Sequence, residues 1–134
     1  MNKPNNLNNN SINIGKEMFN LGYYYEKMWN PKICDFNYDL MKEHYLIAII
    51  NNNNDAMYRL GLYYKNIYYN YDLMKKYYLM SINNGNINTM YKLGLYYEKD
   101  EINYELMKKY YLMAIKEGNL KAKKRLDNFI PTDL

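Results

Sequence analysis

Apolar side chains recur along this chain at the spacing of an α-helix. The pattern predicts one helix over residues 71–84 and a shorter one over residues 56–65. On the longer helix, the residues that share one face, at positions i, i+4, i+7 and i+8, are Met74, Tyr78, Ser81 and Ile82. Charged and amide residues fall largely on the opposite face, so the helix is predicted to be amphipathic.

These helices belong to an internal repeat. Residues 56–88 align with residues 89–121 without a gap, at a period of 33 and with 20 identities. Residues 38–42 keep the same register, but residues 19–24 precede their counterpart by 39 positions, so the first repeat holds six extra residues between these blocks. Residues 119–126 begin a further half-repeat. Three helical hairpins and a C-terminal helix, about seven helices in all, are therefore predicted.

Helical hairpins of this length bury their apolar faces by stacking on their neighbours. The predicted fold class is therefore all-α, an α-solenoid of antiparallel helix pairs with a C-terminal capping helix. A single solenoid is expected over residues 14–134, with repeats at 16–54, 55–87 and 88–120 and a cap at 121–130. The Asn-rich residues 1–13 are predicted to be a disordered tail.

Glycine and asparagine mark the helix ends and one tight crossing. Asn70 and Asn103 stand where an N-cap is required, and Gly85 and Gly118 follow the last turn of the second helix, where a left-handed residue is common. A third glycine slot lies inside the first helix of each hairpin, at Gly22, Gly61 and Gly94. Glycine inside a helix costs about 0.5–1 kcal/mol relative to alanine. Its recurrence therefore indicates a neighbouring helix too close for a side chain.

With these positions in place, the chain resembles the Sel1-like branch of the tetratricopeptide superfamily. In the second repeat the matching residues are Ala56, Leu60, Gly61, Tyr64, Tyr71, Tyr77, Tyr78, Ile82 and Gly85. The third repeat matches through Leu93, Gly94, Tyr97, Tyr104, Tyr110, Tyr111, Ala114 and Gly118. Methionine replaces the usual alanine at Met41, Met74 and Met107. The resemblance implies a stacked-hairpin scaffold that acts as an adaptor in protein complexes.

Composition indicates the cellular compartment and the kind of source genome, but it does not indicate a mechanism. The net charge is +4, and the longest apolar run, residues 45–50, is far too short to cross a membrane. One cysteine, Cys34, excludes an internal disulfide and fits a reducing compartment. No secretory signal is evident at the N-terminus, so a cytoplasmic location is expected. The richness in Asn, Tyr, Ile and Lys indicates an AT-rich genome, such as that of a protist or a giant virus, in which case the location is the host cytoplasm.

The sequence offers few candidate catalytic residues. The single histidine, His44, occupies the slot of Tyr77 and Tyr110 in the other repeats, which indicates a packing role. Cys34 has no evident base beside it, and a lone histidine is neither a catalytic triad nor a metal-ligand set. We therefore expect no enzyme activity, no cofactor and no metal.

A concave groove is the expected binding site. In the register implied by the resemblance, the residues facing it are Phe19, Tyr23, Tyr58, Leu62, Lys65, Tyr91, Leu95, Glu98 and Lys99. Aromatic and apolar side chains along a groove suit a protein or peptide partner. The alternative for these residues is burial between neighbouring first helices.

A second function stays open at the basic C-terminal end. The residues gathered there are Lys116, Lys121, Lys123, Lys124 and Arg125. Lysines beside aromatic rings could bind RNA, although solenoid ends also require a polar outer face. The chain is expected to act as a monomer or within a larger complex, without insertion into a membrane.

Overall fold

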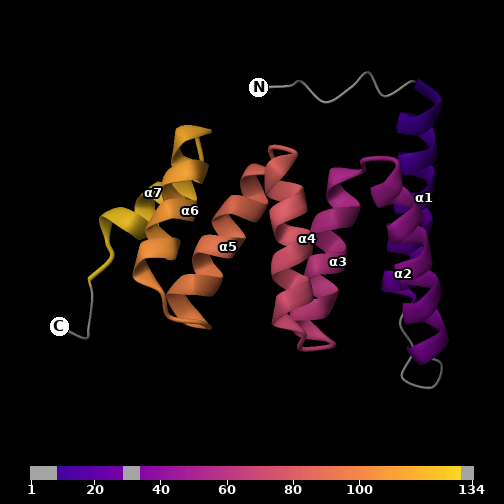
Figure 1. The fold of residues 1–134 in the computed structure, drawn as a ribbon, viewed down its shortest axis with the longest axis horizontal. Coiled ribbons are helices and arrows are strands. Elements are labelled where there is room, and N and C mark those ends of the chain that lie inside the picture. Colours follow the sequence, from indigo (N-terminus) through magenta and orange to yellow (C-terminus); the bar gives the residue numbers. More distant parts are fainter. Residues whose placement is uncertain (1–8, 29–33, 131–134) are drawn as a thin grey trace. The chain divides into compact units, whose positions relative to one another are not determined.

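The computed structural model describes residues 9–28 and 34–130, and this part of the chain is all-helical, as predicted (Figure 1). Its helices are α1 (Asn9–Lys27), α2 (Cys34–Ile50), α3 (Asn54–Asn66), α4 (Tyr71–Asn83), α5 (Ile87–Lys99), α6 (Tyr104–Lys116) and α7 (Leu120–Asp127). No strand occurs within these ranges. None of these helices is both long enough and apolar enough to cross a membrane.

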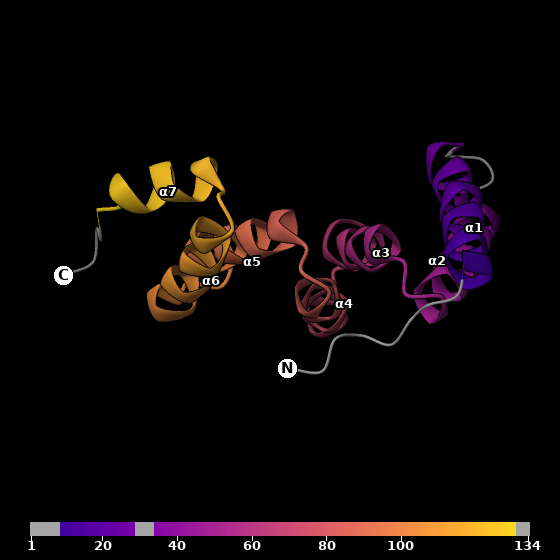
Figure 2. The ribbon, with the colours of Figure 1, turned by 90° about the horizontal axis from the view of Figure 1, so that it is seen from above.

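The chain forms two compact units, residues 1–77 and 78–134, and the boundary falls within α4. In unit 1, α1 pairs with α2, and α3 packs on α2. Unit 2 repeats this arrangement, with α5 paired to α6 and α7 packed on α6 (Figures 1 and 2). Helix pairing is thus present in each unit, and the single solenoid over residues 14–134 stays a prediction.

Asparagine side chains begin the helices. Asn53, Asn86 and Asn119 each accept a hydrogen bond from a backbone N–H three residues further on, at the starts of α3, α5 and α7. The predicted caps Asn70 and Asn103 do the same for α4 and α6 and are confirmed. Each cap satisfies a backbone donor that the first helical turn leaves without a partner, which contributes about 1 kcal/mol.

The helix-ending glycines are also confirmed. Gly85 and Gly118 have φ angles of 82° and 91°. Such angles place them in the left-handed region, where a Cβ atom is unfavourable.

The extra residues of the first repeat divide between a connection and a helix. The connection between α1 and α2 spans residues 28–33, against residues 67–70 and 100–103 in the other hairpins, which accounts for two extra residues. Helix α2 begins four residues before Tyr38, whereas α4 and α6 begin at the equivalent Tyr71 and Tyr104. The insertion therefore gives α2 about one additional turn.

The N-terminal boundary differs from the prediction. Helix α1 begins at Asn9, so residues 9–13, assigned to the tail from their composition, are helical. Ser11 explains part of the difference, because its hydroxyl donates to the Asn51 side chain near the end of α2. Residues 1–8 of the predicted tail lie outside the described residues.

The predicted tight crossing occurs in both hairpins for which the contacts are described. A Cβ atom built on Gly22 would lie 2.5 Å from Cδ1 of Tyr45, and one on Gly94 would lie 2.5 Å from Cδ1 of Tyr111. Both rings are buried, at 0% exposure. Glycine is therefore required because the ring of the second helix lies directly on the backbone of the first. The departures from the family pattern, Met41, Met74 and Met107, are buried as well, as expected of a flexible apolar side chain.

Helix α7 keeps the repeat register but changes its chemistry. Ala122 is buried in the slot of Ala56 and Thr89. Lys123 stands in the slot of Met57 and Met90, and Asp127 stands in the slot of Gly61 and Gly94. Lys123 and Asp127 form an exposed ion pair of 2.7 Å.

Candidate functional site

A carboxylate organises the contact between α1 and α3 in unit 1. Glu26, near the end of α1, accepts a hydrogen bond from the hydroxyl of Tyr45 on α2. The other carboxylate oxygen accepts from the Arg59 guanidinium on α3, at 3.1 Å. Arg59 also lies over the Tyr23 ring, with its guanidinium carbon 4.8 Å from the centroid. Three helices thus meet at Glu26.

Unit 2 contains the same network at equivalent positions. Glu98 on α5 accepts from the hydroxyl of Tyr111 on α6. The Arg125 guanidinium of α7 donates to both Glu98 oxygens, from Nε at 2.9 Å and from Nη2 at 2.8 Å. Two parallel bonds to one carboxylate fix both the distance and the orientation of the arginine. We refer to each set of three residues as a Glu–Arg–Tyr network.

An aromatic pair accompanies each network. The rings of Tyr38 and Tyr63 have centroids 5.3 Å apart in unit 1. At the equivalent slots of unit 2, Tyr104 and Phe129 meet edge to face at 4.8 Å. The middle repeat departs from this design, because the slots of the acid and the arginine there hold Lys65 and Lys92.

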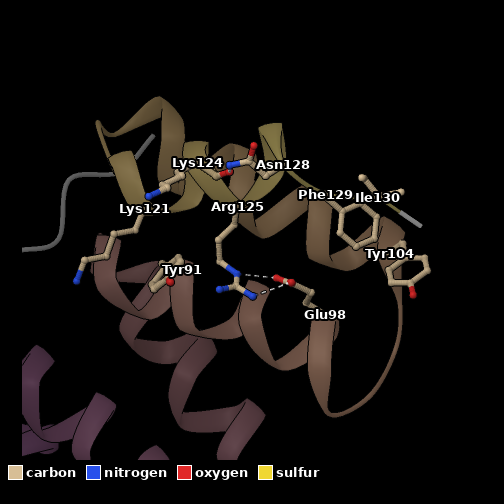
Figure 3. Close-up of a pocket in the computed structure, with 9 residues that line it drawn as sticks. All are labelled: Tyr91, Glu98, Tyr104, Lys121, Lys124, Arg125, Asn128, Phe129 and Ile130. Carbon is tan, nitrogen blue, oxygen red and sulfur yellow. Dashed lines mark hydrogen bonds and ion pairs between the residues drawn. The ribbon is translucent and has the colours of Figure 1, made fainter. Parts of the chain in front are cut away.

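Each network lies at a pocket between two first helices. The unit 1 pocket has a volume of about 360 Å³ and is lined by Glu26, Tyr38, Met41, Arg59, Leu62, Tyr63, Asn66 and Ile67. The unit 2 pocket, of about 680 Å³, is lined by Tyr91, Glu98, Tyr104, Lys121, Lys124, Arg125, Asn128, Phe129 and Ile130 (Figure 3). Both volumes fall in the range of ligand sites in proteins, about 300–1,000 Å³.

Hydrogen bonding and burial set the ionisation of the unit 2 network. The hydrogen bond from Arg125 lowers the pKa of the Glu98 carboxyl below its ordinary value. Burial raises the pKa of the Tyr111 phenol, and the hydrogen bond to Glu98 raises it further. Burial and Glu26 likewise raise the pKa of Tyr45. Near neutral pH the unit 2 network therefore holds a charged acid–arginine pair and a neutral phenol.

Alkaline pH is expected to unfold the chain through these phenols. The folded-state pKa of Tyr45 and of Tyr111 lies above the ordinary value of about 10. The contribution of these two neutral phenols to the free energy of unfolding is therefore fully present below pH 10. It is lost as the pH rises from 10 through the folded-state value. We expect phenolate absorbance to rise in two phases, the second coinciding with loss of helical circular dichroism.

Two substitutions isolate this effect. Tyr111→Phe should reduce the late phase, whereas Tyr69→Phe, at an exposed tyrosine, should leave the unfolding midpoint unchanged. A single titration step with full helicity retained would contradict the assignment.

The predicted groove residues occupy several environments. Tyr91 and Glu98 line the unit 2 pocket, and Leu62 lines the unit 1 pocket. Phe19 and Tyr91 stack on the core rings of Tyr45 and Tyr111, at 5.8 and 6.0 Å. The remaining positions are exposed at Tyr23 and Lys99 and half-buried at Tyr58, Lys65 and Leu95. Their role in binding stays a prediction.

His44 has the packing environment that its slot indicates. Its ring lies 5.3 Å from that of Tyr25, as Tyr77 lies 5.7 Å from Tyr64 and Tyr110 lies 6.0 Å from Tyr97. The His44 Nδ1–H donates to the Leu40 carbonyl at 2.7 Å. Among the described residues, no group of three His, Cys, Asp or Glu side chains is placed to hold a metal ion.

Glu26 and Arg59 were not among the residues predicted from the sequence, and Arg125 was predicted only as part of the basic C-terminal end. One signal was available. The chain has two arginines, and these occupy the same repeat slot, 66 residues apart (125 − 59). Glu26 and Glu98 also share a slot. In a chain that otherwise uses lysine, this coincidence indicates a geometric demand for the planar guanidinium.

Comparison with protein-family models, with curated proteins and with solved structures finds no match to the chain.

Proposed function

We propose that the chain is a Sel1-like, tetratricopeptide-type solenoid that binds a peptide or protein segment and has no enzyme activity. The observation that carries this proposal is the pair of equivalent pockets, each between two first helices and each built on a Glu–Arg–Tyr network. We infer that the chain is a cytoplasmic adaptor and that, within each unit, the first helices carry a binding surface. The compartment is inferred from the single cysteine.

The construction of the pockets favours binding. A buried phenol and an arginine, which is bidentate in unit 2, hold the first helices of each unit at a fixed separation, so little conformational entropy is lost when a ligand is bound. Apolar and aromatic side chains make up much of each lining, as in grooves that anchor peptide side chains. The Glu26–Arg59 and Glu98–Arg125 ion pairs are already formed, so a ligand need not neutralise these four charges.

Selection of random displayed peptides on the immobilised chain tests this function. We expect selected peptides to lose about tenfold or more in affinity with Leu62→Ala or Tyr91→Ala, since pocket anchors dominate binding energy. The matched control is Leu112→Ala, which truncates an exposed leucine on the second helix α6. That change should leave affinity intact, and melting curves should verify the fold of each variant.

RNA binding is the competing function. A fluorescent RNA titrated across a salt series would show a steep loss of affinity with salt if phosphate contacts dominate. Selective RNA binding near 0.15 M salt, together with failure to select any peptide, would overturn the proposal.

A further inference from the structure

The two pockets share the Glu–Arg–Tyr network but differ in the other residues that line them. In unit 1 the side chains that line the pocket beside this network are mainly apolar and include Leu62, Met41 and Ile67. In unit 2, Asn128 replaces Leu62, and two lysines, Lys121 and Lys124, contribute to the wall. The slots of these lysines hold Asp55 and Tyr58 in the second repeat. The same network is therefore surrounded by different side chains in each unit, so the two pockets suit different ligands.

The two lysines add positive charge to the pocket, in addition to the Glu98–Arg125 ion pair. Both guanidinium bonds of Arg125 go to Glu98, so that pair is close to neutral. Lys121 and Lys124 are exposed on α7. The pocket lining thus carries three cations and one carboxylate, a net charge of +2 (3 − 1).

This charge lies at one end of the pocket. Lys121 and Lys124 stand on one side of the Glu98–Arg125 pair, and Phe129, Ile130 and Tyr104 stand on the other (Figure 3). The apolar end is formed by the edge-to-face contact of Tyr104 with Phe129 and by Ile130, which is 78% exposed. A ligand must therefore match a cationic end and an aromatic end at once.

We propose that the unit 2 pocket binds an acidic peptide segment of a partner protein, with carboxylates at Lys121 and Lys124 and an aromatic or large apolar side chain against Phe129 and Ile130. This inference rests on the proposed function and names its partner chemistry. Charge complementarity supports the acidic part, and the exposed apolar end supports the anchor. A polynucleotide fits less well, because its phosphates require cations along a track, whereas the basic side chains here are confined to one end.

Fluorescence anisotropy with the full chain and defined peptides tests the proposal. The first probe carries three acidic residues followed by phenylalanine. A second carries the corresponding amides, and a third has alanine in place of phenylalanine. We expect only the first to bind well, with about tenfold or greater weakening by either change and by Lys121→Glu/Lys124→Glu. Salt should weaken the complex, because its charges are solvent-exposed.

The matched control is Lys108→Glu/Lys109→Glu, which alters net charge equally at two exposed lysines of α6. It should leave affinity for the acidic probe nearly unchanged. Equal weakening by both double variants would reduce the effect to net charge and overturn the site. Binding of an RNA oligonucleotide that depends on Lys121 and Lys124, without binding of the acidic probe, would also overturn it. If selected peptides bind through Leu62 or Tyr91 but ignore both lysines, the acidic specificity fails and the proposed function stands.

Discussion

Gly94→Leu is expected to destabilise unit 2 by about 3 kcal/mol, because the added side chain has no room at the helix crossing. The first side-chain atom alone would lie 2.5 Å from the buried Tyr111 ring. Relief would require α5 and α6 to separate, which would also strain the hydrogen bond from Tyr111 to Glu98. Urea unfolding monitored by circular dichroism measures the loss.

Gly118→Leu serves as the comparison. No atom lies within 4 Å of a Cβ built there, but φ is 91°, so only backbone strain of about 1–2 kcal/mol is expected. In a second comparison, Gly94→Leu/Tyr111→Ala should cost less than the sum of its single changes, because the ring and the new side chain compete for one volume. Strict additivity would show that the crossing is not limited by the ring.

Glu98→Ala is expected to cost about 3 kcal/mol, since it removes the acceptor of both the Tyr111 hydroxyl and the Arg125 guanidinium. The Glu98 side chain is 16% exposed and that of Arg125 is 33% exposed. Water therefore compensates only part of the loss. Thermal and urea unfolding should both register the change.

The control is the other ion pair of α7. Asp127→Ala breaks the contact with Lys123, but both side chains are more than half exposed, so a change of about 0.5 kcal/mol or less is expected. Equal effects of Glu98→Ala and Asp127→Ala would refute a structural role for the Glu–Arg–Tyr network.

The sequence was sufficient for elements whose causes are local. Helix caps such as Asn103, the left-handed Gly118 and the apolar period of α4 depend on residues within a few positions of one another, so the chain reveals them directly. The close crossing at Gly94 could also be predicted, because a glycine that is unfavourable inside a helix recurs at the same slot of each repeat.

Other features depend on distant partners. Glu26 meets Arg59 across 33 residues and Glu98 meets Arg125 across 27, and neither spacing has a local signature. The helical start at Asn9 was hidden for the same reason, because Ser11 is held by Asn51, 40 residues away. Pocket linings follow these long-range contacts, so the groove prediction included Leu62, Tyr91 and Glu98 but omitted the lysines that distinguish unit 2.

The exposed Lys123–Asp127 pair gives α7 a different packing surface from that of α5. In α5, Gly94 leaves room for the Tyr111 ring of α6, whereas in α7 the same slot holds Asp127, whose carboxylate pairs with Lys123. A helix following α7 could not seat an aromatic ring there without burying a charge, which is costly. The same slot therefore admits a close helix crossing in α5 and holds a solvent-exposed ion pair in α7.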